Sequence, residues 1–292
     1  MSELLRHHVS VVQVARCSQD WIDSVAADTI TQFVKPPAVV TRATVMRTML
    51  QLFLTVVASM LVAVAGLFVV QWFVPSAVLH ANNEVAGNYL QTLGTIYAVL
   101  LAFVVFVVWT QYTEASKFVE QEADELADVL RYAGTCPEPA RSKMLEAARA
   151  YAREQIENEW TAMARGAASP RAGQLLDVFW HALADQEPQT ARDQALYAET
   201  VARFNDMCDA RTDLLQNSRT RMPPIMWLLL LTGAFSTVAS MYLFGLDNSC
   251  CLALMTASLA GAVSFVLFLI HDLDNPFTGD WRVTPEPIRL VF

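Results

Sequence analysis

Two long stretches of this sequence, Thr48–Ser116 and Met222–Trp281, contain no lysine or arginine, although the chain has 20 basic residues. Each stretch holds two apolar runs separated by a short turn. A helix of about 22 residues reaches about 33 Å, which is enough to cross the roughly 30 Å hydrocarbon core of a bilayer. The pattern predicts an all-α integral membrane protein with four transmembrane helices arranged as two hairpins.

The composition agrees with this class of protein. Hydrophobic residues make up 54% of the chain and charged residues only 17%, whereas a soluble domain carries about 25% charged residues. The net charge is -9, and 19 of the 29 acidic residues lie between Glu114 and Asp213. This acidity argues against nucleic-acid binding. The first long apolar run begins only near Met49, and no small-residue cleavage site follows a short apolar core, so we expect no cleavable signal peptide.

The distribution of basic residues predicts the orientation. The expected spans are Met49–Val70, Tyr89–Thr110, Ile225–Leu246 and Cys250–Ile270. The N-terminal segment, the middle region and the C-terminal tail carry 5, 13 and 2 basic residues, and the hairpin loops carry none. The positive-inside rule places both termini and the middle region in the cytoplasm. The expected parts are an N-terminal segment (1–47), a first transmembrane hairpin (48–110), a helical cytoplasmic domain (111–224), a second transmembrane hairpin (225–271) and a cytoplasmic C-terminal tail (272–292).

Outside the spans the sequence also favours helices. In the N-terminal segment, Asp20–Phe33 has the pattern of an amphipathic helix. The second span continues without a helix breaker to Gly134. Helical periodicity then predicts three further helices at Ala140–Met163, Gln174–Gln186 and Gln189–Arg221. A loop at Gly166–Gly173 is expected between the first and the second of these helices.

Several motifs resemble one family. The most specific is the run LDNPFTGDWRV at Leu273–Val283. Weaker matches are GTIYAVLLAF at Gly94–Phe103, the following Trp109, and Glu159-Trp160. Over about residues 45–290 the chain resembles the bestrophin-like family of bacterial membrane proteins. The resemblance implies four spans in a bacterial inner membrane with cytoplasmic termini. True bestrophins are remote relatives and oligomeric ion channels, so the analogy implies a homo-oligomer, a pentamer or tetramer, that passes inorganic ions, with anions slightly favoured.

One face of the second span is suited to line a pore. Four uncharged spans cannot enclose a polar path within one chain, so a pore would lie on the symmetry axis of a ring of copies. Residues spaced by three or four share one helical face, polar toward the outside and apolar toward the cytoplasm, namely Thr92, Thr95, Val99, Ala102 and Phe106. Val99 and Phe106 would form a dewetting gate. The alternative is that this face packs against a neighbouring helix.

Two acidic groups follow the spans. Past the second span, Glu114, Glu122 and Glu125 would surround a cytoplasmic vestibule that favours cations, opposing the anion analogy. The alternative is a solvated helix face. After the fourth span, Asp272, Asp274 and Asp280 could bind an ion or stabilise a loop. True bestrophins have an acidic calcium-binding cluster at a similar place, but the EF-hand order is missing here. We therefore expect Asp274 to cap a turn or meet an arginine, and Phe277 to enter the helical domain.

No enzyme signature is present. The sequence has no Gly-rich phosphate loop, GxSxG or HExxH motif. Its five cysteines lack CxxC spacing, so neither a metal nor a cofactor is expected. The leading hypothesis is an oligomeric passive ion channel in the lipid bilayer. The alternative is a non-transporting scaffold or sensor that recruits a partner through its cytoplasmic helices.

Overall fold

A computed structural model of the chain describes residues 42–246, 248–279 and 281–292. Every regular element in these ranges is a helix, which confirms the all-helical class. The predicted amphipathic helix at Asp20–Phe33 lies outside the described residues.

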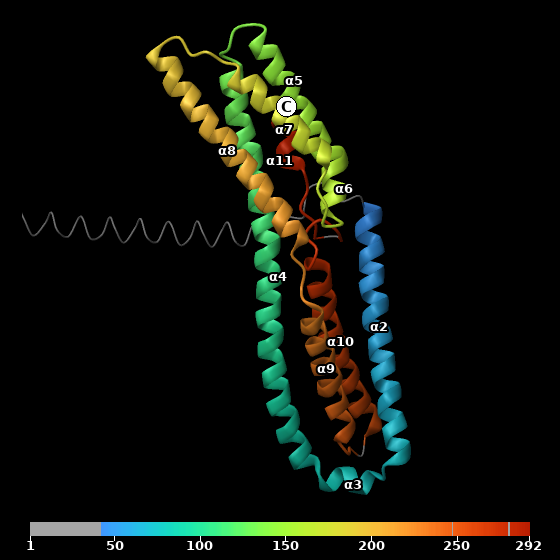
Figure 1. The fold of residues 1–292 in the computed structure, drawn as a ribbon. Coiled ribbons are helices and arrows are strands. Elements are labelled where there is room, and N and C mark those ends of the chain that lie inside the picture. Colours follow the sequence, from blue (N-terminus) through green and yellow to red (C-terminus); the bar gives the residue numbers. More distant parts are fainter. Residues whose placement is uncertain (1–41, 247, 280) are drawn as a thin grey trace, which may run out of the picture. The chain divides into compact units, whose positions relative to one another are not determined.

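In the part of the chain that the structure describes, four helices are long and apolar enough to cross a membrane, as predicted. They are α2 (Arg42–Phe73), α4 (Asn83–Ala133), α9 (Pro224–Ser240), which continues into the 3-10 turn η2 (Met241–Leu243), and α10 (Ser249–Leu273). In Figure 1, α9 and α10 lie side by side between α2 and the first half of α4. The four spans therefore form one bundle.

The two hairpin loops are tied to each other. The first hairpin turns through the short helix α3 (Ser76–Ala81). The amide of Asn83 donates to the carbonyl of Gly245 at 2.7 Å and accepts the Gly245 N–H at 2.9 Å. A Cβ at Gly245 would lie 2.6 Å from the backbone nitrogen of His80. This close approach requires glycine, and it fixes the second hairpin loop against the first.

Helix α4 extends far beyond the bundle. At about 1.5 Å per residue its length is roughly 76 Å, more than twice the hydrocarbon core. It ends at Ala133, where Gly134 follows, as the absence of earlier breakers predicted. We call the second half of α4 and the elements packed on it the distal region. Its other helices are α5 (Ala140–Glu154), the π-helical turn η1 (Gln155–Glu159), α6 (Trp160–Met163), α7 (Pro170–Ala184), α8 (Ala191–Arg219) and α11 (Glu286–Arg289).

Three details of the distal region differ from the sequence prediction. The predicted loop at Gly166–Gly173 is too long, because α7 already begins at Pro170, where the Ser169 hydroxyl accepts the N–H of Ala172. The π-helical turn η1 interrupts a helix expected to be regular. Helix α8 spans Ala191–Arg219 and is shorter at both ends than the predicted Gln189–Arg221.

The core of the distal region includes the C-terminal segment. Fully buried side chains from α4, α5, α7 and α8 fill it, among them Leu126, Tyr151, Phe179 and Leu214. Phe277 is also buried, and its ring lies edge-on to Trp160 with the centroids 5.7 Å apart. The prediction that Phe277 enters the helical domain is therefore confirmed.

The contact between α4 and α9 depends on a glycine. A Cβ at Gly233 would lie 2.5 Å from the ring of Tyr97, whose hydroxyl donates to the Leu230 carbonyl at 3.1 Å. We expect Gly233→Ala to destabilise the folded chain by about 1–3 kcal/mol through overpacking. Thermal unfolding in detergent measures this. Gly87→Ala is the control, since a Cβ there meets nothing within 4 Å. Equal stability of both variants would contradict a tight contact.

Candidate functional site

The predicted pore residues lie together on an uncovered face of α4. Thr92, Thr95, Val99, Ala102 and Phe106 are all exposed, with Val99 51% and Phe106 67% accessible. The opposite side of α4 packs into the bundle through buried Tyr97, Val104 and Val108. Among the described residues, no helix of the same chain covers the exposed face. The face is therefore left for lipid or for another copy of the chain.

The two threonine hydroxyls on this face are already satisfied. Thr92 donates to the carbonyl of Asn88 at 2.9 Å, and Thr95 donates to that of Gln91 at 2.8 Å. Such bonds to the preceding turn let a hydroxyl face an apolar surrounding. Each oxygen keeps acceptor capacity toward the outside of the helix. The part of the face nearer the N-terminus of α4 is thus weakly polar, and the part at Val99 and Phe106 is apolar.

The acidic residues beyond the span separate into two environments. Glu114 is exposed, but Glu122 is fully buried and the side chain of Glu125 is only 13% exposed, within 3.4 Å of Arg203. The structure corrects the expectation for Glu122. It lies on the stripe Ala115, Val119, Glu122, Leu126 and Val129, which faces the distal core, and so cannot face a vestibule.

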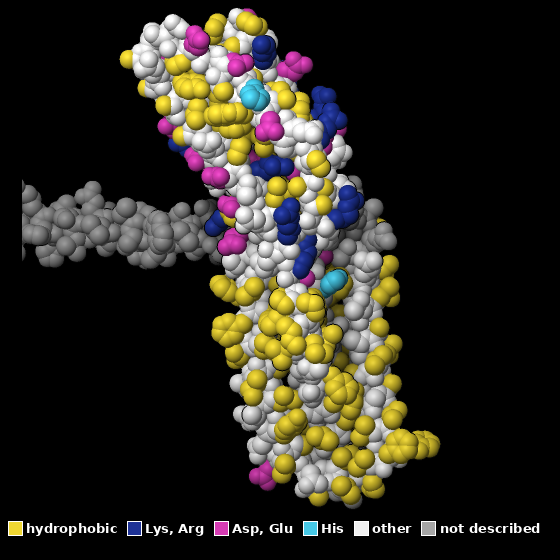
Figure 2. All heavy atoms as spheres, viewed as in Figure 1, with side chains coloured by type: hydrophobic (Ala, Val, Ile, Leu, Met, Phe, Trp, Pro, Cys, Tyr) yellow, Lys and Arg dark blue, Asp and Glu magenta, His cyan; other side chains and the backbone are white. Residues whose placement is uncertain are grey.

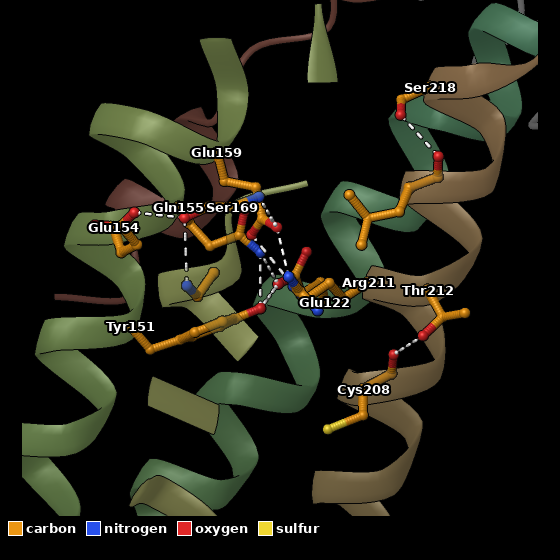
Figure 3. A network of polar contacts seen from close by, with 12 residues as sticks. Glu122, Tyr151, Glu154, Gln155, Glu159, Ser169, Cys208, Arg211, Thr212 and Ser218 are labelled. Atoms are coloured by element: carbon orange, nitrogen blue, oxygen red, sulfur yellow. Dashed lines mark hydrogen bonds and ion pairs between the residues drawn. The ribbon is translucent and has the colours of Figure 1, made fainter. Parts of the chain in front are cut away.

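Glu122 belongs to a buried network of hydrogen bonds (Figure 3). Its Oε1 accepts hydrogen bonds from the Tyr151 hydroxyl and, at 2.5 Å, from Nε2 of Gln155. The same Nε2 lies 2.7 Å from the Tyr151 oxygen. Oε2 of Glu122 and Oε1 of Gln155 are buried without a hydrogen-bond partner. One carboxyl oxygen is therefore well satisfied and the other is not.

A buried ion pair lies next to this carboxyl. Nη2 of Arg211 donates to Oε1 of Glu159 at 2.5 Å, and Nε of Arg211 donates to Oε2 at 3.2 Å. Glu159 is fully buried, and it also accepts the Ser169 N–H at 3.3 Å. The wider turn of η1 places Gln155 and Glu159 on the inner side that Tyr151 faces. The network joins α4, α5, η1 and α8.

The electrostatics of Glu122 follow from its position. It lies twelve residues beyond the apolar stretch that ends near Thr110, so it is outside the membrane-spanning part of α4. Burial raises the pKa of Glu122 to about 7. The Tyr151 hydrogen bond and the Arg211 charge lower the pKa, and the Glu159 charge raises it. Near neutral pH, this carboxyl changes between neutral and charged forms inside the protein.

The acidic residues at the C-terminal end of α10 stabilise the segments around it. Oδ1 of Asp274 accepts the Met222 N–H at 2.8 Å, and Oδ2 of Asp272 accepts the Trp281 N–H at 3.2 Å. Asp274 also lies near Arg221. Burial lowers the pKa of Arg221, and the negative charge of Asp274 raises that pKa by a smaller amount. Asp280 lies outside the described residues. Among those described, no three His, Cys, Asp or Glu side chains are placed to hold a metal ion.

Four spans and a helical distal region define an integral membrane protein, and its family follows from comparison. A family model, the Bestrophin-like domain, matches residues 39–288. The chain belongs to the Bestrophin-like family. A search of curated proteins finds no match.

Solved structures share the fold. A bacterial Bestrophin homolog from Klebsiella pneumoniae has a TM-score of 0.60 and 12% identity, over 82% of this chain and 95% of that one. Another solved membrane protein has a TM-score of 0.60 and 12% identity, over 84% of this chain and 96% of its own. At such identities the likeness establishes the fold alone. The network around Glu122 joins segments far apart in the sequence, and only the stripe spacing gives a sequence signal for it.

Proposed function

We propose that the protein is a passive ion channel formed by a ring of copies, a pentamer or tetramer, with the exposed face of α4 lining the axis. The observation that carries this proposal is the uncovered face itself. It presents two threonines and then small and apolar residues, while Tyr97, Val104 and Val108 on the opposite side of α4 pack into the bundle of the same chain. Membership of the Bestrophin-like family supports the same assignment. No acidic or basic residue lies between Tyr89 and Thr110, as expected for a conduit without a transport cycle.

The narrow part of the proposed pore lies at Val99 and Phe106. Apolar side chains that surround the axis of a pore gate conduction by excluding water from the constriction that they form. The ring would lie in a bacterial inner membrane with both termini and the distal region in the cytoplasm. The basic residues outside the two hairpins support this orientation.

The charge beyond the span bears on ion preference. Glu114 and Asp124 are exposed on α4 past the apolar stretch, together with Lys117. Their net negative charge attracts cations to the inner mouth. The analogy with true bestrophins favours anions. Reversal potentials of the reconstituted protein under a salt gradient decide between the two, because each ion class sets an opposite sign.

Replacement of the gate aromatic tests the pore. In liposomes, we expect Phe106→Ala to raise ion flux above that of the unmodified ring, because a smaller side chain widens an apolar constriction and lets water enter. Phe235→Ala is the matched control, since Phe235 is 73% exposed on α9, away from the α4 face. Flux should be measured on intact oligomers. An oligomer that passes neither anions nor cations would remove the channel assignment and favour the scaffold. Equal increases in both variants would remove α4 as the lining helix.

A further inference from the structure

Arginines converge where the membrane bundle meets the distal region. Arg219 and Arg221 lie just before α9 begins at Pro224, Arg282 follows the end of α10, and Arg165 follows α6. On the face that Figure 2 shows, the span part is free of dark blue side chains, and these begin where it ends. Four arginines on three separate segments therefore follow or precede the ends of helices at the end of the apolar bundle.

Specific contacts hold these segments together. Gly166 has a φ of 70°, and its Cβ position lies 3.8 Å from the Cα of Arg219, so the turn after α6 contacts the end of α8. The Asn275 amide donates to the Ala164 carbonyl at 3.1 Å. The indole of Trp160 donates to the Val283 carbonyl at 3.1 Å. The arginines are thus carried on a fixed framework rather than on separate loops.

The positive charge of this cluster is only partly balanced within the described chain. Arg165 and Arg219 are exposed, and neither they nor Arg282 form an ion pair with a described residue. Burial lowers the pKa of Arg221, and the charge of Asp274 only partly opposes that effect. The nearby carboxylates of Asp274 and Asp272 accept backbone N–H groups from Met222 and Trp281 and keep their negative charge, so they offset only part of the charge of four guanidinium groups. The cluster therefore has unused capacity for an anion.

Aromatic side chains mark the same level as the membrane interface. The rings of Trp109 and Trp281 lie edge-on with centroids 6.1 Å apart, and Trp109 also lies 5.7 Å from Tyr112. Tryptophan and tyrosine favour the headgroup level of a bilayer. Basic groups between helices at this level are suited to bind anionic headgroups.

We propose that Arg165, Arg219, Arg221 and Arg282 form a binding site for the phosphate of an anionic lipid headgroup. The lipid chains would lie along the apolar ends of α9 and α10, and the phosphate would contact the guanidinium groups, which bind phosphate oxygens with paired N–H donors. The proposal holds whether or not the ring conducts ions.

Lipid retention tests this site. The full chain is purified in detergent, mixed with phosphatidylglycerol or phosphatidylcholine of the same acyl chains, and the bound lipids are counted by native mass spectrometry. We expect preferential retention of phosphatidylglycerol, and loss of that preference in Arg165→Gln/Arg219→Gln. The matched control is Arg149→Gln/Arg153→Gln on the exposed side of α5. Absence of the preference in the unmodified chain, or equal loss in both variants, would overturn the proposal.

Two further arms need no variant. Raising the ionic strength from about 0.1 M to about 1 M shortens the Debye length from about 10 Å to about 3 Å, and we expect the preference to shrink accordingly. Inorganic phosphate is then added as a competitor. We expect bound phosphatidylglycerol to stay, because its chains contribute apolar contacts. Displacement by inorganic phosphate would assign the arginines to a free anion and overturn the lipid assignment.

Discussion

Arg211→Met is expected to lower the stability of the folded chain by about 3–5 kcal/mol, because removal of one partner leaves a buried charge without compensation. Glu159 is fully buried, and without Arg211 the hydrogen-bond donor that remains to it among the described residues is the Ser169 N–H at 3.3 Å. Thermal or denaturant unfolding in detergent, followed by tryptophan fluorescence, measures the loss.

Two companion variants identify the cause. Arg131→Met removes only an exposed pair with Asp128, and it should cost only about 0–1 kcal/mol. Arg211→Met/Glu159→Gln removes both charges, and we expect it to recover much of the stability lost in Arg211→Met. If Arg211→Met costs no more than Arg131→Met, the buried pair contributes little to the fold.

Glu122→Gln is expected to remove most of the pH dependence of stability between weakly acidic and weakly alkaline solution. Below about pH 4.5 the carboxyl is protonated in the folded and unfolded chains alike. As the pH rises, the unfolded chain ionises first, so the folded state loses stability until about pH 7, where its own carboxyl ionises. The loss amounts to about 3 kcal/mol. The variant should therefore be more stable than the unmodified chain at about pH 8 and similar to it at about pH 5.

The comparison between chains isolates Glu122 from the other buried acids. Burial raises the pKa of Glu125, and the Ser169 hydrogen bond lowers that of Glu154, but both effects are common to the two chains. Glu114→Gln is the control, since Glu114 is exposed on the same helix. An unfolding midpoint that shifts with pH to the same extent in Glu122→Gln and in the unmodified chain would show that Glu122 does not titrate in the interior.

Lipid as a solvent explains why so much of the fold follows from the sequence. A helix surrounded by hydrocarbon excludes charge along its whole length, so the stretches free of lysine and arginine predict the four spans directly. The long α4 follows from the absence of a breaker before Gly134. The contacts of Asp274 and Phe277 follow from a short acidic and aromatic run directly after the fourth span. Because this run leaves the bilayer, its aromatic ring has to pack against the distal region.

The environment of Glu122 shows where sequence reasoning was limited. Glu114, Glu122 and Glu125 were expected to surround one vestibule, but Glu122 shares the helical face of Val119 and Leu126 and is buried with them. Its neighbours Tyr151 and Gln155 come from another helix, whose π-helical turn has no signal in the sequence. The start of α7 was recognisable in principle, because Ser169-Pro170 is a typical helix-initiating pair.

The uninterrupted course of α4 has a mechanical consequence. Beyond Gly94 this helix contains neither glycine nor proline up to Ala133, so it has no hinge between the bilayer and the distal tip. A stiff rod of this kind behaves as a lever. A rearrangement around Glu122 is expected to tilt the whole of α4, so that the displacement extends to the opposite leaflet. A partner that binds the distal end of α4 is expected to displace Phe106 without contacting the membrane.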